Sequence, residues 1–552
     1  MEINSFFLDS EVLICISHSG VFWISPSHRK TEFVLFMSTQ AARFESIIDW
    51  HHIPISASFS SPGMVVCTIH MIVLMATRSI DYGRTPWHSL NVDTSPIESK
   101  MEAWEGPIDT GEVPEDGSSF DVIVVGGGPS GSAAASYNAM NGCKVLLIEK
   151  GIWPRDKVCG DAVGGKSLSH VKELGVKEMV EDTPHFTVDS IVFGSANGST
   201  VKVMLPQDEL EKKMAGYSLP RKQFDYMMFK RATEIVNEAG GSVIQGFSVK
   251  EVLEEGGKIT GVSGSFGGRS SESPTLSFSS ALTVGAGGYR CPVATKLVEG
   301  IHGEPMRDDD HYCGGYREYW EGVGGFEGSQ GPIEIHFIEG VIPGYFWLFP
   351  VQEGVVNVGI GMVISEQRKQ TGASKSLKKK QRWVIENHPV FKERFKDAKI
   401  VEGSQKGWQL PFGSPRKNPP SFQPRRTAGA GVMCVGDAAS LVDPFSGEGI
   451  GNGLLSAKMA ANHFDKDEHA GGFPEEQAIE YMTDLWGTLG KELTNSHRLQ
   501  KVVKWKRLMN WFVGKSSRKK EMGDMLTGMI ADKEAQKALW SPWFLFKTIL
   551  LP

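Results

Sequence analysis

The distribution of apolar and polar residues changes along this chain. Residues 1–100 show neither a clear helical period nor a clear strand alternation, and they lack glycine punctuation. From residue 120 the pattern becomes regular. An apolar run at 121–125 predicts a strand, the alanine-rich stretch after it predicts a helix, and KVLLIE at 144–149 predicts a second strand. This order of elements is typical of a dinucleotide-binding unit.

The turn between the first strand and the helix has GxGxxG spacing, with glycines at Gly126, Gly128 and Gly131. The first permits a tight turn, the second lets a pyrophosphate approach the backbone, and the third lets helix and strand pack closely. Glu149 ends the next strand, where a carboxylate binds ribose hydroxyls. Together with Ser130 in the turn, these residues predict a dinucleotide site that fits FAD and NAD equally.

A second regular pattern lies at 343–362, where Tyr345, Trp347 and Phe349 are spaced two residues apart. In an extended strand these three rings point to one face. The resulting slab has two interpretations. It is either a sheet face buried against a helix or a wall for a long apolar substrate.

Far downstream, the pattern at 431–461 predicts another strand, loop and helix. The strand ends at Gly436-Asp437, and the helix starts near Ile450. An acid and a helix N-terminus would thereby face one ligand. The alternative is that Asp437 only stabilises the turn or caps the helix.

Residues 462–552 have a helical pattern. The segment at 498–520 is basic and amphipathic, and the chain ends in the apolar, aromatic stretch WSPWFLFKTILLP at 540–552. The segment is either a surface helix that covers the core or a helix that docks on an anionic membrane surface.

Composition narrows the function classes. The chain has 552 residues and a net charge of −7, which argues against nucleic-acid binding. Its seven cysteines show no CxxC and no Cys/His spacing, which favours a reducing compartment and predicts no metal site. The apolar run at 64–76 is shorter than the about 20 residues of a membrane-spanning helix.

An acidic segment at 102–119 separates the irregular start from the regular remainder and is typical of a flexible tether. We therefore predict that 1–119 is an N-terminal extension with an acidic linker, and we hypothesise that the functional polypeptide begins at Met101. Acidic residues near the start, such as Glu2, are unlike a transit peptide. The predicted location is cytoplasmic and peripheral on a membrane, with organelle targeting left open.

The pairing of GxGxxG with a distal GDAA…DP…GEGI resembles the FAD enzymes of the p-hydroxybenzoate hydroxylase fold. The resemblance implies an α/β protein with a Rossmann-like FAD-binding domain, a mixed-sheet substrate domain and a helical C-terminal region. The expected limits are 120–180, 217–300 and 425–461 for the first, 181–216 and 301–424 for the second, and 462–552 for the third.

The same resemblance implies contacts with FAD. Asp437 would contact the ribityl chain, while Gly449 and Ile450 would face the flavin. Arg221 starts a helix similar to the arginine-led helix of that group, and the backbone of Val249 would meet the adenine.

The segment ALTVGAGGYRCPVATKL at 281–297 departs from that group, because Gly287 stands where an aspartate is usual. That aspartate is associated with nicotinamide and pyrophosphate contacts, and the chain has no second strand–GxGxxG–helix. The electron donor therefore stays open between NADPH and a ferredoxin-like protein.

Two stretches indicate a family within this fold. YxWxFP, then eight residues, then GxG resembles the signature of geranylgeranyl reductases, which use FAD to saturate polyprenyl chains. The resemblance implies that these residues bind the substrate: Tyr345, Trp347, Phe349, Pro350, Gly359 and Gly361.

The second stretch is RDKVCGDAVGGKSL at 155–168, which is more similar to archaeal digeranylgeranylglycerophospholipid reductases than to chlorophyll-type enzymes. By this resemblance Cys159, Gly160 and Ala162 lie against the isoalloxazine. The implied role is in membrane lipid biosynthesis.

An isolated alkene is a poor hydride acceptor, so protonation to a tertiary carbocation would come first. Aromatic faces attract cations by about 0.5–2 kcal/mol each, and apolar burial adds about 0.8 kcal/mol per CH₂. The slab is therefore interpreted as the wall of a prenyl tunnel, and Cys159 and Asp161 are the candidate proton donors. The alternatives are an aromatic-type monooxygenase of the same fold, a reductase of chlorophyll or quinone side chains, and a flavoprotein that only carries prenyl chains.

Overall fold

The computed structural model describes residues 5–7, 13–17, 20–24, 107–205, 216–267, 273–416, 425–505, 507, 510 and 513–515. The chain divides into two units, Met1–Leu90 and Asn91–Pro552. In the first unit β1 (Ser5–Phe7), β2 (Leu13–Ser17) and β3 (Gly20–Ile24) form an antiparallel sheet. The sequence pattern did not indicate these strands, because each has only three to five residues.

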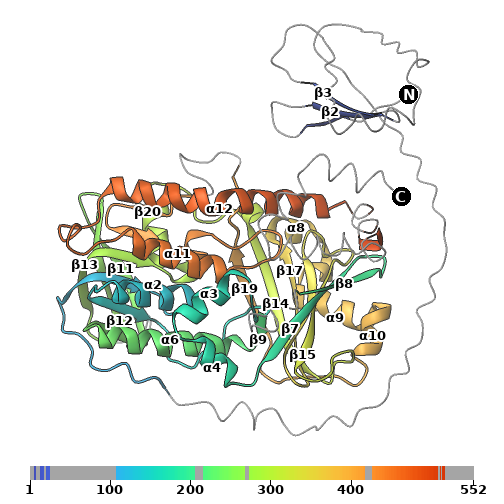
Figure 1. Cartoon of the computed structure of the whole chain (residues 1–552), viewed down its shortest axis with the longest axis horizontal. Helices are drawn as coiled ribbons and strands as arrows, with labels where there is room; N and C mark the ends of the chain where they lie inside the picture. Colours follow the sequence, from blue (N-terminus) through green and yellow to red (C-terminus); the bar gives the residue numbers. More distant parts are fainter. Residues whose placement is uncertain are drawn as a thin grey trace, which may run out of the picture. The chain divides into compact units, whose positions relative to one another are not determined.

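The second unit contains two sheets (Figure 1). The first has the order β10-β5-β4-β13-β12-β11, with β21 beside β13 and β20 beside β21. Its strands are β4 (Ser119–Val125), β5 (Val145–Glu149), β10 (Ser242–Gln245), β11 (Phe247–Glu255), β12 (Lys258–Phe266), β13 (Leu276–Gly285), β20 (Ala428–Gly429) and β21 (Val432–Cys434).

Parallel pairing explains why the central strands of this sheet are continuous apolar runs. β4 pairs in parallel with β5 on one side and β13 on the other. Both faces of such strands are covered, and Val122, Ile123 and Val124 are fully buried. The helix α2 (Pro129–Met140) contacts both α6 (Arg221–Glu238) and α11 (Ile450–Asn462). The carboxyl ends of β4, β13 and β21 meet near the start of α2, because a Cβ on Gly126 would touch Ala286 and one on Gly436 would touch Ser130.

The second sheet has the order β18-β14-β17-β16-β15-β7-β9-β6, with β19 paired to β14 and β8 to β7. Its strands are β6 (Ala162–Val163), β7 (Phe186–Gly194), β8 (Thr200–Met204), β9 (Gly216–Ser218), β14 (Tyr312–Glu321), β15 (Gln330–His336), β16 (Tyr345–Gln352), β17 (Val355–Val363), β18 (Lys399–Ile400) and β19 (Lys406–Pro411). β6 lies within the predicted FAD-binding segment, and the domain limits stay a prediction.

Alternate residues of β16 pack on opposite faces of this sheet. Phe346 and Leu348 belong to a core that includes side chains of α9 (Leu377–Asn387) and α10 (Pro389–Arg394). Trp347 and Phe349 belong to a separate core, and Tyr345 packs against its border. The three rings therefore share one face, as their spacing predicts.

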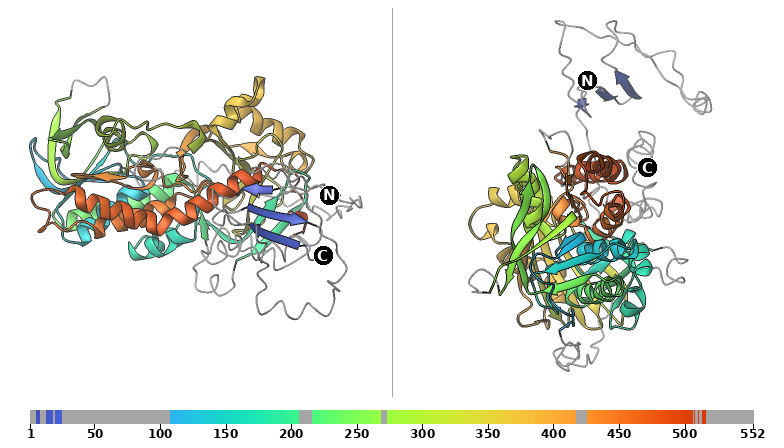
Figure 2. Two further views of the ribbon diagram at one scale, coloured as in Figure 1. Left: turned by 90° about the horizontal axis from the view of Figure 1, so that it is seen from above. Right: turned by 90° about the vertical axis from the view of Figure 1, so that its left-hand side faces the viewer.

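The remaining helices connect or cover the two sheets, and α12 runs alongside α11 (Figure 2). They are α3 (Lys166–Glu173), α4 (Lys177–Glu181), η3 (Gly288–Arg290), α7 (Pro292–Thr295), η4 (Lys296–Ile301), η5 (Asp309–His311), α8 (Ile364–Lys369), η6 (Gly372–Lys375), η7 (Gly436–Ala439) and α12 (Glu475–Val503).

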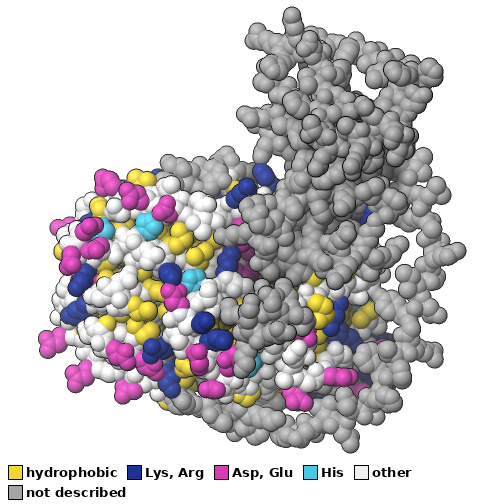
Figure 3. Space-filling model, viewed as in Figure 1, with side chains coloured by type: hydrophobic (Ala, Val, Ile, Leu, Met, Phe, Trp, Pro, Cys, Tyr) yellow, Lys and Arg dark blue, Asp and Glu magenta, His cyan; other side chains and the backbone are white. Residues whose placement is uncertain are grey.

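The surface of the second unit carries both signs of charge. On the face drawn in Figure 3, acidic and basic side chains are intermixed over the described part. No helix among the described residues is both long and apolar enough to span a membrane.

Candidate flavin and prenyl-chain site

The glycine turn after β4 is too tight for any side chain at two of its positions. Gly126 has a φ of +116°, and a Cβ there would lie 2.5 Å from the carbonyl oxygen of Ala286. A Cβ on Gly131 would lie 1.7 Å from the carbonyl oxygen of Gly126. Gly128 caps α2 without a side chain, so the first N–H groups of the helix stay accessible to a phosphate.

Glu149 is fixed at the end of β5 with only 3% of its surface exposed. Its carboxylate accepts hydrogen bonds from the backbone N–H groups of Gly127 and Gly151, each at 2.8 Å. Arg155 adds an ion pair with this carboxylate at 3.2 Å. The acid thus lies beside the glycine turn, where the sequence predicts a ribose contact.

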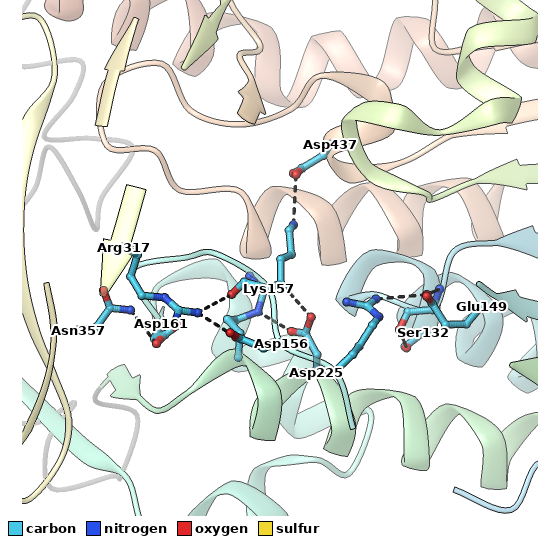
Figure 4. Close-up of polar contacts among 12 residues, drawn as sticks. Ser132, Glu149, Asp156, Lys157, Asp161, Asp225, Arg317, Asn357 and Asp437 are labelled. Carbon is cyan, nitrogen blue, oxygen red and sulfur yellow. Dashed lines mark hydrogen bonds and ion pairs between the residues drawn. The ribbon is translucent and has the colours of Figure 1, made fainter. Parts of the chain in front are cut away.

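The distal motif folds onto the same turn. A Cβ on either Gly436 or Gly453 would lie 2.2 Å from Ser130 Oγ, so this serine sits between η7 and α11. Lys157 Nζ donates to Asp437 Oδ2 at 3.3 Å (Figure 4). Segments about three hundred residues apart in the sequence therefore form one side of one site.

The start of α11 lies next to Asp437. Gly449 caps this helix, and a Cβ on it would lie 3.5 Å from Asp437 Oδ1. Ile450 is the first helical residue and is half-buried. The helix N-terminus and the acid thus share one location, as the strand–loop–helix pattern predicts.

Arg221 begins α6 and is 3% exposed. Its guanidinium pairs with Asp225, with one Nη2–Oδ2 distance of 2.9 Å, and also interacts with Cys159. Burial alone would lower the pKa of Arg221, but Asp225 and Cys159 outweigh it and raise the pKa well above its ordinary value. Val249 is half-buried and lies at a bulge of β11.

The loop that carries Cys159 packs directly on the aromatic slab. A Cβ on Gly160 would lie 2.8 Å from the Phe349 ring and 3.7 Å from Trp347 Nε1. Asn357 Nδ2 donates to the carbonyl oxygen of Cys159 at 2.8 Å. Ala162, two residues on, packs against the same apolar core as the slab. The predicted flavin contacts and the predicted substrate wall are therefore adjacent.

Asp161 is fully buried and adopts a φ of +68°, which is unusual for a residue with a side chain. Its Oδ2 accepts hydrogen bonds from Tyr319 OH at 2.5 Å and Asn357 Nδ2 at 2.7 Å. Its Oδ1 is buried and has no hydrogen-bond partner among the described residues. Burial raises the pKa of this carboxyl to about 6, although Arg317, Tyr319 and Asn357 favour the charged form.

A polar network continues from Asp161 along β14, and Figure 4 shows Arg317 directed at this loop. The Arg317 guanidinium lies 4.2 Å from the Tyr319 ring centroid and pairs with Asp156 at 2.8 Å. Lys406 also pairs with Asp156 at 2.8 Å. Burial alone would raise the pKa of Asp156, but Arg317 and Lys406 hold it below its usual range.

Sequence reasoning missed Arg317, Tyr319 and Asn357. The available signal was polar side chains within buried strands: Arg317 and Tyr319 alternate in YREYWE, and Asn357 lies inside the YxWxFP…GxG segment. A charged residue in an apolar strand needs partners, and such positions gather at functional sites.

Two rings of the slab, Trp347 and Phe349, are buried, and Tyr345 is half-buried. Neighbouring ring centroids are 5.9 Å apart for Tyr345 and Trp347 and 6.4 Å apart for Trp347 and Phe349. Tyr345 OH donates to the carbonyl oxygen of Ser446, in the loop before α11, and Trp347 Nε1 donates to Asn357 Oδ1 at 2.8 Å. Hydrogen bonds therefore fix two of the three rings at the border of the flavin site.

The glycines of the GxG motif make space for Trp347. A Cβ on Gly359 would lie 2.0 Å from Trp347 Cζ2, and one on Gly361 would lie 3.6 Å from Cζ3. Pro350 is buried in β16 opposite Val356. The motif thus positions the indole, and a direct substrate contact of these three residues stays a prediction.

The end of α12 approaches the slab core. Leu499 packs against that core and Val503 is part of it. The helix ends at Val503, and Trp505 is 54% exposed. Most of the predicted amphipathic segment beyond this point, and all of 540–552, lie outside the described residues.

Two family models match the chain. Residues 119–308 match a model described as an FAD binding domain, and residues 327–403 match one described as a geranylgeranyl reductase catalytic domain. The second segment includes the slab and Asn357.

Curated proteins and solved structures agree with these matches. The chain is 29% identical over 384 residues to digeranylgeranylglycerophospholipid reductase 1 of Methanococcoides burtonii, over 68% of this chain and 82% of that protein. It is 27% identical over 384 residues to menaquinone reductase of Mycobacterium tuberculosis, over 66% and 81%. A geranylgeranyl bacteriochlorophyll reductase-like structure from Thermoplasma acidophilum has a TM-score of 0.60 at 20% identity, over 78% of this chain and 98% of that chain.

These comparisons confirm the predicted α/β fold class and FAD as the cofactor. The residues fit FAD: a glycine turn that a Cβ on Gly126 or Gly131 would fill, a buried carboxylate beside it, and Asp437 in η7. The placement of each residue toward bound FAD stays a prediction.

Proposed function

We propose that this chain, an FAD-dependent oxidoreductase of the geranylgeranyl reductase family, saturates C=C bonds in the geranylgeranyl chains of a glycerophospholipid. The observation that carries the proposal is the contact between Gly160 and the rings of Phe349 and Trp347. It places the loop that resembles a flavin contact against a buried aromatic surface. The names of relatives, digeranylgeranylglycerophospholipid reductase among them, support the choice of substrate.

Each part of the site has a role in this proposal. The glycine turn, Glu149 and Asp437 hold FAD, which in its reduced form supplies hydride. The slab binds the prenyl chain, excludes water and stabilises positive charge on the alkene carbon through its ring faces.

The proton comes from Asp161 in this proposal. Because its pKa is about 6, a much larger fraction of this carboxyl is protonated near neutral pH than of an ordinary aspartate. Tyr319 and Asn357 occupy one carboxylate oxygen, which leaves Oδ1 to carry the proton. Cys159 is the weaker candidate because its side chain interacts with the Arg221 guanidinium. In one reaction the alkene gains a proton from Asp161 on one carbon and a hydride from reduced FAD on the other, and the flavin becomes oxidised.

A lipid-bound substrate requires access to a membrane surface. We include in the proposal that the basic segment at 498–520 docks on anionic lipid. Residues 498–503 of this segment are the end of α12, and Leu499 and Val503 among them pack at the slab core. Flotation with anionic vesicles tests this step. A protein that does not float with the vesicles, and whose behaviour does not change when 540–552 is deleted, contradicts it.

Anaerobic turnover tests the function. The FAD-loaded protein is reduced with dithionite and mixed with vesicles of geranylgeranylated glycerophospholipid, or in a parallel sample with menaquinone. The expected result is flavin reoxidation with the lipid and a product that has gained two hydrogen atoms per reduced bond. A saturated bond found by mass spectrometry in the side chain of menaquinone, after its ring is reoxidised in air, with the lipid unchanged, would move the substrate to quinone side chains. A flavin that stays reduced until air enters would contradict reduction of alkenes and favour oxygen chemistry.

A further inference from the structure

A second cavity lies beside the last turns of α12. It has a volume of about 730 Å³, and residues of η5, β17, α8 and α12 line it together with Arg416 and Arg425. We call it the Arg425 cavity. Five basic side chains of its lining form a connected cluster through their electrostatic interactions: His311, Arg416, Arg425, His497 and Lys501.

Arg425 is a buried cation whose hydrogen-bond partners are neutral. Only 2% of its surface is exposed, and it makes no ion pair with a carboxylate of the described residues. Its Nη2 donates to the carbonyl oxygen of Met306 at 2.9 Å and lies 3.4 Å from Tyr312 OH. Its Nε is buried and has no hydrogen-bond partner within the described part of the chain. Because a buried charge is costly without a charge of opposite sign, Arg425 is suited to an anionic ligand.

The groups around Arg425 also favour an anion. Burial and the nearby Arg425 lower the pKa of Arg416 to about 10, although Asp308 at 3.4 Å opposes this shift. A negative charge between the two guanidinium groups would remove their mutual repulsion. Pairs of arginines that share one anion are common at phosphate sites, because the guanidinium fork matches phosphate oxygens.

Two histidines form a further wall of the cavity. The rings of His311 and His497 stack with centroids 5.7 Å apart. Burial lowers the pKa of both to about 4; Arg416 lowers that of His311 further, and Lys501 lowers that of His497 further. Both imidazoles are therefore neutral at neutral pH and leave the positive charge of the cavity to its arginines and lysines.

The acidic side chains of the lining are paired or exposed. They are Glu304, Asp308, Asp310 and Glu366. Glu304 pairs with Arg426 at 3.2 Å, Glu366 pairs with Lys504 at 2.7 Å, Asp308 pairs with Arg416, and Asp310 is exposed. Lys501, like Arg425, makes no ion pair with a described carboxylate. Two such cations match the charge of a phosphate monoester, which is about −1.5 to −2 near neutral pH.

The Arg425 cavity is separate from the surface proposed for the prenyl chain. His497 and Lys501 line the cavity, whereas Leu499 and Val503 pack at the slab core. Residues four apart share a helix face and residues two apart do not, so the cavity and the slab core lie on different sides of α12. Lys501 also belongs to the basic segment at 498–520. A ligand here would therefore be held beside the segment proposed to meet lipid.

We propose that the Arg425 cavity binds a phosphate ester, with the phosphate held by Arg416, Arg425 and Lys501. A lipid head group and a soluble ester present the same phosphate oxygens, so both have the chemistry that this cavity recognises. The inference does not depend on the proposed function, because it concerns a site on another side of α12.

Equilibrium binding tests the inference. Inorganic phosphate and glycerol 3-phosphate are titrated by calorimetry into the FAD-loaded full chain, whose glycine turn is then occupied. The variants are Lys501→Glu and, as a matched control, Lys491→Glu; both lysines are exposed on α12, and Lys491 lies outside the cavity. We expect Lys501→Glu to bind glycerol 3-phosphate at least about tenfold more weakly and the control to bind like the wild type. Equal affinity in all three proteins, or no binding to the wild type, would overturn the inference.

Arg425→Met tests the buried cation. This change also removes the hydrogen bond to Met306, so the measurement is the rise in melting temperature that glycerol 3-phosphate causes within each protein. A ligand that binds only the folded state raises the melting temperature, and a general effect of the salt would be equal in all proteins. The rise should be present in the wild type and in Lys491→Glu and smaller in Arg425→Met. An equal rise in all three would overturn the inference.

Flotation with phosphatidylglycerol vesicles distinguishes the two sources of phosphate. Arg425 is buried and lies outside the basic segment, so Arg425→Met keeps the charges of that segment. Weaker flotation of this variant, with glycerol 3-phosphate competing against vesicles in the wild type, would assign the cavity to a lipid head group. Unchanged flotation, with glycerol 3-phosphate binding lost, would assign it to a soluble ester. Unchanged flotation with unchanged glycerol 3-phosphate binding would overturn the inference. None of these measurements needs turnover, so phosphate binding can fail while alkene reduction succeeds, and the reverse.

Discussion

Replacement of Asp161 by asparagine separates proton donation from the structure of the site. The amide has the shape of the carboxyl, and its oxygen can accept the hydrogen bonds from Tyr319 and Asn357 that Oδ2 accepts now. The amide nitrogen then occupies the place of Oδ1. Asp161→Asn should therefore fold and bind FAD while it cannot deliver a proton.

The expected loss of rate is large and depends on pH. General acids contribute about 100-fold to 10,000-fold, so single-turnover reoxidation of the reduced flavin by geranylgeranyl lipid should slow by at least about 100-fold. In the wild type the rate should fall as pH rises through about 6, because burial raises the pKa of Asp161 to about 6 and the acid form is then lost. In the variant this fall should be absent. A wild-type rate in Asp161→Asn would refute the assignment.

The Asp161 carboxyl also makes the free energy of unfolding depend on pH. The direction of its pKa shift determines whether that free energy rises or falls with pH. Its pKa is 3.8 in ordinary surroundings and about 6 in the fold. Between these values the folded state binds more protons than the unfolded chain, so the free energy of unfolding falls as pH rises from about 4 to about 6. The difference corresponds to about 3 kcal/mol at 1.36 kcal/mol per pH unit. Denaturant unfolding of Asp161→Asn should lack this fall, and the exposed control Asp397→Asn should keep it.

Two further substitutions test the surroundings of this acid. Tyr319→Phe removes a hydrogen bond that favours the carboxylate of Asp161, so the midpoint of the pH–rate profile should rise by about half to one pH unit; an unchanged midpoint would exclude Tyr319 from positioning the acid. Gly359→Ala would place a Cβ 2.0 Å from Trp347, so the free energy of unfolding should fall by about 1–3 kcal/mol in denaturant titration. Gly487→Ala, exposed in α12 with nothing within 4 Å, is the control and should not lose stability.

The sequence pattern was enough to predict the parts of the site that are formed by residues close together in the sequence. The glycine turn and Glu149 lie within one strand–helix–strand unit, where backbone geometry limits the residue types at each position. The shared face of Tyr345, Trp347 and Phe349 follows from the two-residue period of a strand. Neither feature needs knowledge of which strands pair.

The polar network could not be predicted in this way. Tyr319 is 158 residues from Asp161, and Asn357 is 196 residues from it. Tyr319 and Asn357 are register partners in the pairing of β14 with β17, and this pairing brings them to one carboxylate. Similarly, the space that Gly359 leaves for Trp347 depends on a cross-strand register that the sequence does not state.

The central claim is that one reduced flavin saturates one double bond of a geranylgeranyl chain. The most direct measurement is a single turnover under nitrogen, with dithionite-reduced protein, excess geranylgeranylated glycerophospholipid and mass spectrometry of the lipid. The account predicts one newly saturated bond for each flavin that becomes oxidised. Oxidised flavin without saturated lipid, or a flavin that remains reduced in the presence of the lipid, would contradict it.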